Sequence, residues 1–254
     1  MNIAVLLNMV PDLVEELEID ASGTALDTQW MRYVLNESDE HALEQALLLK
    51  DRHGARVTVL ALDYGEVEDT LFSALAKGAD EAVKLAGLSE APSKRAAAAA
   101  FKTALSGMAC DLVLTGVYAI DDQDGHTAGL LAGLMDLPFV GVTRSVEPAD
   151  GKVLVQKEYA GGLAAEIEVS LPAVIGVLSA PQPPRYVPVA KIRETRKTRK
   201  LTEQDITGAE SLPGPTIRRM FKPEAAEHAQ MLEGSPEDVA KQIVMILAER
   251  GLVP

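Results

Sequence analysis

Apolar residues in the first half of the chain form short runs that alternate with longer segments of helical spacing. Short runs rich in Val, Ile, Leu and Ala are typical of buried strands, whereas apolar positions about three to four residues apart are typical of amphipathic helices. The short runs predict strands at residues 2–8, 56–63, 81–85 and 111–116. The longer segments predict helices at residues 39–53, 66–77, 92–106 and from His126 or Thr127 to before Pro138. Ser38 is the expected cap of the first helix, which Gly54 ends.

The regular alternation of strands and helices predicts the fold class. Parallel strands need crossover connections, and the connecting helices pack back onto the sheet. We therefore expect an α/β fold, a mostly parallel twisted sheet with helices on both faces. Beyond Pro138 the rhythm changes, because strand-like runs follow one another without long helices between them, at residues 139–146, 152–159, 163–170 and 173–178. This part of the sheet is expected to contain antiparallel strands.

The C-terminal quarter of the chain has a different character. Residues 179–188 are rich in proline, which predicts an extended connector. The last sixteen or so residues again have helical spacing, with Ser235 as cap and Pro236 in the first turn. We expect an α/β domain over residues 1–190, and a segment of residues 191–254 that acts as an arm packing on another chain.

Composition narrows the class of protein further. Apolar residues make up 47% and charged residues 24% of the chain, an ordinary globular balance. The single cysteine, Cys110, cannot close an internal disulfide or supply a cysteine-cluster metal site. No stretch approaches the roughly 18 uncharged apolar residues of a membrane span, and no basic segment precedes an apolar run at the start. We therefore expect no membrane insertion and a cytoplasmic location.

Charge is unevenly distributed along the chain. The formal net charge is −14, yet residues 191–200 carry six basic residues and one acid, a local charge of +5. The remaining residues therefore carry −19, which repels nucleic acid, because phosphate binding requires a basic face. The basic segment is either a solvated surface string or a docking element for an acidic partner, with Val189 and Ile192 as apolar contacts.

A candidate ligand site lies in the loop of residues 117–126. In open parallel sheets, ligands bind beyond the carboxyl ends of the strands, where the strand order reverses. This loop leads from a predicted strand directly into a helix that begins with small residues, Thr127, Ala128 and Gly129. The free N–H groups of a helix start favour an anion such as phosphate. Three acids of the loop would repel phosphate unless they point elsewhere: Asp121, Asp122 and Asp124.

Other chemistry has little support in the sequence. Neither G-x-x-x-x-G-K-[ST] nor G-x-G-x-x-G is present, so ATP hydrolysis and ordinary dinucleotide redox lose support. The four histidines have no metal-binding spacing, and only His126 lies in the candidate loop. The adjacent pair Asp121 and Asp122 is more typical of capping or solvation than of acid–base chemistry. We expect a ligand-binding protein without catalytic residues of its own.

Several motifs resemble those of a known family. Residues 116–129 are similar to a loop of the form Gly-Lys-Gln-Ala-Ile-Asp-Asp-Asp followed by Asn-Gln-Thr-Gly-Gln, chiefly at residues 119–122 and at Thr127. Further similar motifs are Asn36 with Glu40, Ala42 and Glu44; residues 74–80; Glu158 with Gly161 and Gly162; Leu171-Pro172-Ala173; and Pro184-Arg185-Tyr186. On these residues the chain resembles the β subunit of the electron transfer flavoprotein.

The resemblance implies a fold of the adenine-nucleotide alpha-hydrolase-like type and a heterodimer. This chain would hold AMP as a structural nucleotide and support the FAD held mainly by the α subunit. The residues implied for the AMP site are Leu6, Asn36, Glu37, Ser38, Asp39, Leu62, Asp63, Ala119, Ile120, Asp121, Asp122, Gln123, Asp124, Gly125, His126, Thr127, Ala128, Gly129 and Leu130.

The resemblance also implies redox partners. Flavin dehydrogenases would donate electrons, and a quinone-linked oxidoreductase would accept them. The family's recognition segment follows the Pro-Arg-Tyr motif, with Val189 at its anchoring position, and Lys157 and Glu158 fall near the mobile flavin domain. Three alternatives stay open: an electron-bifurcating form with a second FAD in place of AMP, a stand-alone adenine-nucleotide-binding protein, and a nucleotide-dependent ligase or hydrolase.

Overall fold

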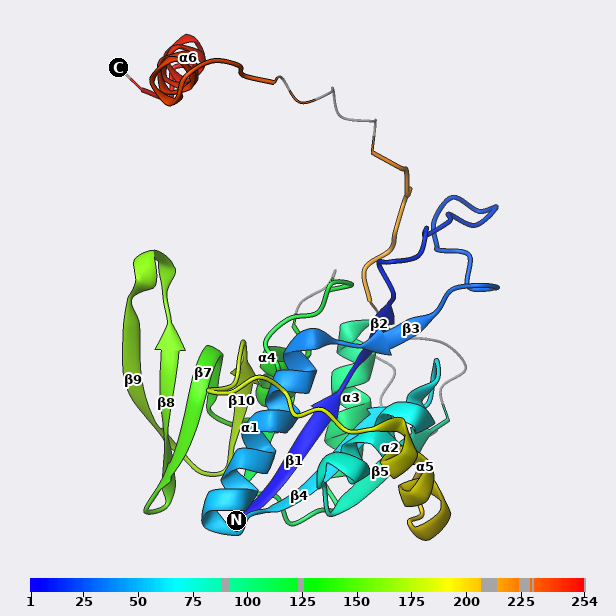
Figure 1. The fold of residues 1–254 in the computed structure, drawn as a ribbon. Coiled ribbons are helices and arrows are strands. Elements are labelled where there is room, and N and C mark those ends of the chain that lie inside the picture. The colour runs from blue at the N-terminus through cyan, green and yellow to red at the C-terminus, as the bar shows by residue number, and fades with distance from the viewer. Residues whose placement is uncertain (88–91, 123–125, 207–213, 224–228, 230, 254) are drawn as a thin grey trace. The chain divides into compact units, whose positions relative to one another are not determined.

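A computed structural model describes the whole chain except residues 88–91, 123–125, 207–213, 224–228, 230 and 254. The chain divides into two compact units, Met1–Arg218 and Arg219–Pro254. The first unit contains the large sheet and the helices that cover it (Figure 1). Within the described residues, no helix is long and apolar enough to cross a membrane.

The large sheet of the first unit has nine strands in the order β11-β5-β4-β1-β6-β10-β7-β8-β9. Their bounds are β1 Asn2–Leu7, β4 Arg56–Leu62, β5 Glu81–Ala86, β6 Leu112–Gly116, β7 Phe139–Ala149, β8 Lys152–Glu158, β9 Ala164–Ser170, β10 Ala173–Val177 and β11 Thr202–Asp205. All neighbours from β11 to β7 pair in parallel, and only β7–β8 and β8–β9 pair antiparallel. The predicted α/β class, with antiparallel strands in the second half, is confirmed.

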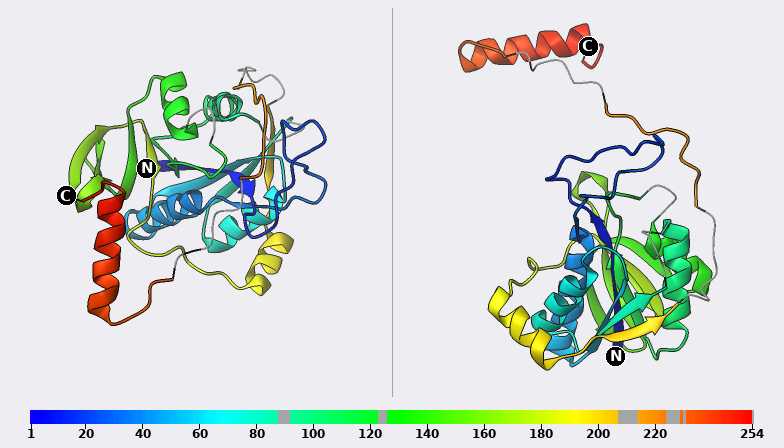
Figure 2. Two further views of the ribbon diagram at one scale, coloured as in Figure 1. Left: turned by 90° about the horizontal axis from the view of Figure 1, so that it is seen from above. Right: turned by 90° about the vertical axis from the view of Figure 1, so that its right-hand side faces the viewer.

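Four helices cover the two faces of this sheet. Their bounds are α1 Glu37–His53, α2 Val67–Lys77, α3 Lys94–Leu105 and α4 Thr127–Met135. Along β1, Ile3 and Val5 pack in one buried cluster with residues of α1 and α2, whereas Ala4 and Leu6 pack in another with residues of α3 and α4. The right-hand view of Figure 2 shows these two helix layers on opposite sides of the sheet. Helices therefore lie on both faces, as the alternation of elements predicts.

The start of α1 differs from the prediction. The helix begins at Glu37 with Asn36 as its cap residue, so the expectation that Ser38 caps it is wrong. Asn36 makes no side-chain capping bond, because its amide donates instead to Asp39 Oδ2 at 2.9 Å and to the Tyr118 carbonyl at 2.9 Å. The end agrees with prediction, since Gly54 adopts the left-handed conformation that terminates helices.

The basic segment lies within the first unit. Residues 189–198 form α5 (Val189–Thr198), which packs beside α2, and β11 then pairs in parallel with β5 at the edge of the sheet. The first compact unit thus includes α5 and β11, and the domain boundary at residue 190 stays a prediction. The four residues of β11 are all polar, so the strand has no apolar pattern in the sequence. The next residue, Ile206, is buried.

The proline-rich connector between β10 and α5 forms no helix or strand, as predicted, and is attached to α1. Arg185 contacts both carboxylate oxygens of Glu44 at 2.9–3.1 Å, and its backbone N–H donates to Glu44 as well. Arg185 also pairs with Asp51 at 2.9 Å, and Ala180 N–H donates to His41. Because the Glu44 side chain is only 4% exposed, this ion pair fixes the path of the connector.

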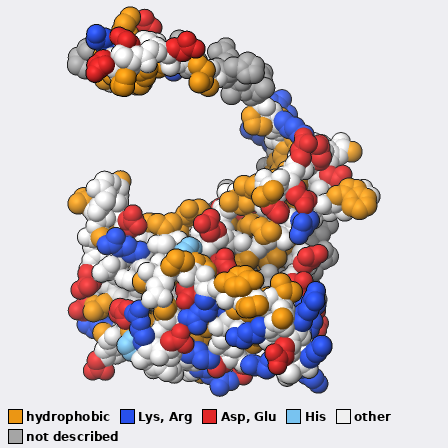
Figure 3. Space-filling view, viewed as in Figure 1, with side chains coloured by type: hydrophobic (Ala, Val, Ile, Leu, Met, Phe, Trp, Pro, Cys, Tyr) orange, Lys and Arg blue, Asp and Glu red, His pale blue; other side chains and the backbone are white. Residues whose placement is uncertain are grey.

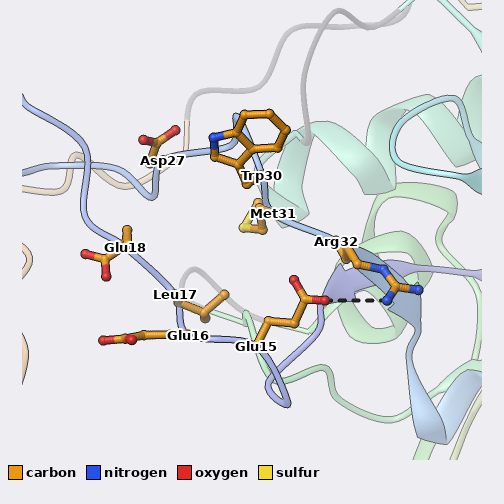
Figure 4. A pocket seen from close by; sticks show the side chains of 8 residues that line it. All are labelled: Glu15, Glu16, Leu17, Glu18, Asp27, Trp30, Met31 and Arg32. Atoms are coloured by element: carbon orange, nitrogen blue, oxygen red, sulfur yellow. Dashed lines mark hydrogen bonds and ion pairs between the residues drawn. The ribbon is translucent and has the colours of Figure 1, made fainter.

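A long excursion leaves the sheet after β1. Strands β2 (Met9–Pro11) and β3 (Tyr33–Leu35) pair antiparallel at its base. Its loop surrounds a hollow of about 170 Å³, lined by Glu15, Glu16, Leu17, Glu18, Asp27, Trp30, Met31 and Arg32 (Figure 4). Trp30, one of these lining residues, is 82% exposed.

The second unit contains one described helix, α6 (Pro236–Glu249). Ser235 caps it as predicted, since its hydroxyl accepts from Asp238 N–H while the Asp238 carboxylate accepts from Ser235. None of the residues of α6 is buried, and Ile243, Val244 and Met245 are exposed.

Candidate functional site

The strand order reverses beside β1. The chain passes from β1 to β4 and β5 on one side, and then returns to β6 on the other. The carboxyl ends of β1 and β6 therefore flank the point where the strand order reverses, the usual ligand position in this class of sheet. We refer to this region as the crevice. The start of α1 and the loop after β6 meet there, since Asn36 donates to the Tyr118 carbonyl.

The carboxylate of Asp39 joins the elements around this crevice. It is completely buried, and its two oxygens accept five hydrogen bonds. Oδ2 accepts from the backbone and side-chain nitrogens of Asn8 at 3.2 and 3.0 Å and from Asn36 at 2.9 Å. Oδ1 accepts from Thr115 Oγ1 at 2.8 Å and Gly116 N at 2.5 Å. Asp39 therefore ties the ends of β1 and β6 to the first turn of α1.

Burial is the largest influence on the ionisation of Asp39. Desolvation raises the pKa of Asp39, and the hydrogen bonds from Gly116, Asn8, Asn36 and Thr115 act in the opposite direction. Four of its five partners are N–H groups, which cannot accept the proton of a protonated carboxyl, and only the Thr115 hydroxyl could do so. The surroundings are therefore arranged for the carboxylate.

Gly116 allows α1 to approach β6 closely. A Cβ atom at this position would lie 2.7 Å from Ser38 Cβ, 2.8 Å from Asp39 N and 2.9 Å from Asn36 Nδ2. These contacts are shorter than side chains allow, and one of them is with backbone. Glycine is therefore required where the strand end meets the Asn36–Asp39 turn.

The loop after β6 is held in place by local hydrogen bonds. Asn36 donates to the Tyr118 carbonyl, which connects the loop to the start of α1. Asp122 Oδ2 accepts from Ala119 N at 2.8 Å and lies 2.8 Å from His126 Nδ1. Ala119 is buried, whereas Tyr118 and Ile120 are about half exposed at the crevice.

The aspartates of this loop are paired with a lysine from another element. Lys94, at the start of α3, places Nζ 2.7 Å from Asp121 Oδ1 and 3.6 Å from Asp122 Oδ1. The lysine side chain is 7% exposed, and that of Asp122 is 10% exposed. A phosphate at the start of α4 requires the loop acids to be directed elsewhere, and Asp121 and Asp122 are engaged by the Lys94 cation. Asp124 lies outside the described residues.

The helix start that the sequence points to is present. α4 begins at Thr127, with Thr127 and Ala128 buried, and Leu130 N–H makes a helical bond to the His126 carbonyl. The N–H groups that precede it in the first turn have no partner within an α-helix, so this end of α4 can receive an anion. Gly129 and Leu130 are partly buried in the same turn.

The other residues expected at the nucleotide site fall into three groups. Leu6 and Leu62 are buried in the cluster that α3 and α4 cover, and Ser38 is buried in the first turn of α1. Asp63 follows β4 and is partly exposed, and Glu37 is exposed. Gln123, Asp124 and Gly125 lie outside the described residues.

The four residues expected to contact partners are not brought together. Lys157 and Glu158 end β8, near one edge of the sheet, where Lys157 Nζ donates to the Gly141 carbonyl at 2.7 Å. Val189 and Ile192 lie on α5, which packs beside α2 toward the other edge. Val189 is 58% exposed, and Ile192 packs partly against the core. Figure 3 shows basic side chains gathered over the region of α5.

Metal binding has no candidate in the structure as described. No group of three or more His, Cys, Asp or Glu side chains is close enough to hold an ion among these residues. His126 contacts a single carboxylate, that of Asp122.

Comparison with known proteins identifies the family. A family model described as the electron transfer flavoprotein domain matches residues 24–207, more than half of the chain. The chain belongs to the electron transfer flavoprotein family. It is 29% identical to the electron transfer flavoprotein subunit beta of Methylophilus methylotrophus, over 98% of both chains. It is 32% identical to that of Clostridium acetobutylicum, over 76% of this chain and 74% of the relative. It is also 29% identical to the caffeyl-CoA reductase-Etf complex subunit CarD of Acetobacterium woodii, over all of both.

Within this electron transfer flavoprotein fold, sequence reasoning missed three residues that shape the crevice. Asn8 and Gly116 end the strands that flank it, and each contacts Asp39. Both residues come directly after a buried apolar run, and this position at the carboxyl end of a strand indicates the ligand-binding edge of the sheet. Lys94 had no such signal, because it lies far along the chain from the loop that it contacts.

Replacing Asp39 by asparagine is expected to destabilise the fold. The amide would direct a donor group toward donors, so at least one buried hydrogen bond is lost and another group is left unsatisfied. Chemical denaturation of Asp39→Asn should show an unfolding free energy lower by about 2–4 kcal/mol. Glu37→Gln, an exposed change in the same turn, should shift it by less than about 0.5 kcal/mol. Equal effects of the two changes would contradict this role of Asp39.

Gly116→Ala should separate the start of α1 from β6. We expect a loss of about 1–3 kcal/mol in thermal or chemical unfolding, because the added methyl group meets backbone and polar atoms. Gly133→Ala in α4 is the matched control, since its added Cβ meets nothing within 4 Å. That helix substitution should stabilise the protein by about 0.5–1 kcal/mol. A neutral Gly116→Ala would show that the close approach is not required.

Proposed function

We propose that this chain is the β subunit of a heterodimeric electron transfer flavoprotein that holds AMP and supports the FAD of an α subunit. In this role it is an electron-carrier subunit, without catalytic residues of its own. The observation that carries the proposal is the crevice at β1 and β6, where a helix start suited to an anion adjoins a loop whose described aspartates pair with Lys94. The full-length matches to β subunits support the assignment.

The residues present fit a bound adenylate. The phosphate would lie against the N–H groups and hydroxyl of Thr127 and its neighbours at the start of α4. Residues 119–122 and His126 would form one wall, and the Asn36–Asp39 turn would hold that wall through the bond to Tyr118. Leu6, Leu62 and Asp63 would form the base, beside the ends of β1 and β4. Residues 123–125 complete the proposed site in sequence.

The flavin, when bound between the subunits, supplies the electron chemistry. This chain would help to bind and orient the flavin, and it would contact the redox partners of the heterodimer. Val189 and Ile192 on α5 would dock flavin dehydrogenases or a quinone-linked oxidoreductase, and Lys157 and Glu158 would contact the α subunit. The exposed apolar residues of α6 would pack on that subunit as well. A cytoplasmic location is part of the same proposal.

Denaturing release of nucleotides from the purified complex tests the cofactor assignment. We expect a stable yellow complex of this chain with an α subunit that releases FAD and AMP in equal amounts. Chromatography of the released nucleotides, with quantification against protein, measures this ratio.

The other outcomes of this measurement are informative. Release of two FAD per complex would replace AMP by a second flavin and favour the bifurcating form. A colourless protein that purifies without a second chain and binds adenine nucleotide would favour the stand-alone alternative. Nucleotide turnover that is lost in an Asp121→Asn, Asp122→Asn variant would favour a ligase or hydrolase.

Docking through α5 is tested by Val189→Asp in the purified complex. A buried carboxylate at an apolar contact weakens association, so flavin reduction by a donor flavin dehydrogenase should slow by about tenfold or more at low donor concentration. Val14→Asp is the control, because Val14 is also exposed, at 94%, in the loop that follows β2. It should change the rate less than about twofold. Equal slowing by both changes would contradict docking at Val189.

A further inference from the structure

Lys94 occupies a position that local rules disfavour. It is the first residue of α3, where the positive end of the helix dipole repels a cation. The first turn of α3 contains no acidic residue to compensate, and Ser93 already caps it by accepting from Ala96 N–H. The Lys94 side chain is nevertheless 93% buried by the surrounding structure, since only 7% of it is exposed. A lysine at this place requires stabilisation from outside its helix.

The stabilisation comes from the proposed nucleotide loop. Lys94 Nζ lies 2.7 Å from Asp121 and 3.6 Å from Asp122, whereas α3 is separated from that loop by β6. Asp122 is further engaged, since Ala119 N–H donates to its other oxygen and His126 lies 2.8 Å from that oxygen. Lys94 is therefore joined to the one loop that leads into the start of α4.

The pairing changes the charge that a ligand meets. Asp121 and Asp122 together carry −2, and Lys94 reduces the sum for the three groups to −1. Like charges repel an incoming anion strongly in a partly buried site, because the effective dielectric constant there is low. A neutral ligand is much less sensitive to the same charges.

We propose that Lys94 is the specificity-determining residue that lets this loop accept a nucleotide phosphate. The inference rests on the proposed AMP site and goes beyond it, because it assigns the preference for AMP over uncharged adenosine to a residue of α3. Lys94 acts by neutralising Asp121 and Asp122, and not by contacting the base or ribose.

Equilibrium dialysis of the full-length chain, stripped of bound nucleotide, tests this with AMP and adenosine as separate probes. Lys94→Met should weaken AMP binding by about tenfold or more and adenosine binding by less than about threefold, since only the anion meets the uncovered charge. Raising the salt concentration should reduce the difference in AMP affinity between Lys94→Met and the original chain. Lys102→Met, near the other end of α3, is the control and should leave both affinities unchanged.

Compensating variants separate charge from structural damage. Lys94→Met with Asp121→Asn restores a sum of −1, so it should recover AMP binding to within about threefold of the original chain. If the double variant stays as weak as Lys94→Met, or if AMP and adenosine weaken equally, the inference is overturned while the nucleotide site stands. If the unmodified chain binds neither probe, the proposed AMP site itself fails.

Discussion

The buried carboxylate of Asp39 is the interaction on which the arrangement of the crevice depends. Its five donors come from three separate elements: the residue after β1, the cap residue of α1 and the end of β6. The Asn36 amide also donates to Tyr118. Without the Asp39 carboxylate, the five donors would lose their hydrogen bonds to it, and a buried polar group without a partner is costly. The same contacts oblige residue 116 to be glycine. One side chain thus couples the stability of the central strands to the geometry of the candidate site.

The second constraint is electrostatic. The chain carries a net charge of −14, and a site for an anion must be built against that background. Two features favour the proposed anion site: the start of α4, where N–H groups lack helical partners, and a lysine that engages the adjacent aspartates. Neither uses an exposed basic patch. The basic cluster of α5 belongs to a different element, which packs beside α2.

The fold was predictable because its signals are local. Buried strands of Val, Ile and Leu alternate with helices, and residues such as Gly54 mark their ends. The candidate loop was predictable for the same reason, since a strand leads directly into a helix start. The features that the sequence did not predict depend on contacts between residues that are distant in the chain. Asn36 rather than Ser38 is the cap residue of α1, and its amide donates to Asp39 and Tyr118. Strand β11 joins the sheet through backbone pairing with β5, although its side chains are polar.

The order of strands has a further consequence. β8, with Lys157 and Glu158, lies at one margin of the sheet, whereas α5, with Val189, lies toward the margin formed by β5 and β11. Arg185 anchors the approach to α5 on α1 through its ion pair with Glu44. Two proteins that used these regions would not compete for space. In the proposed function, an α subunit at β8 and a redox protein at α5 would therefore contact opposite sides of the sheet and could be bound at the same time.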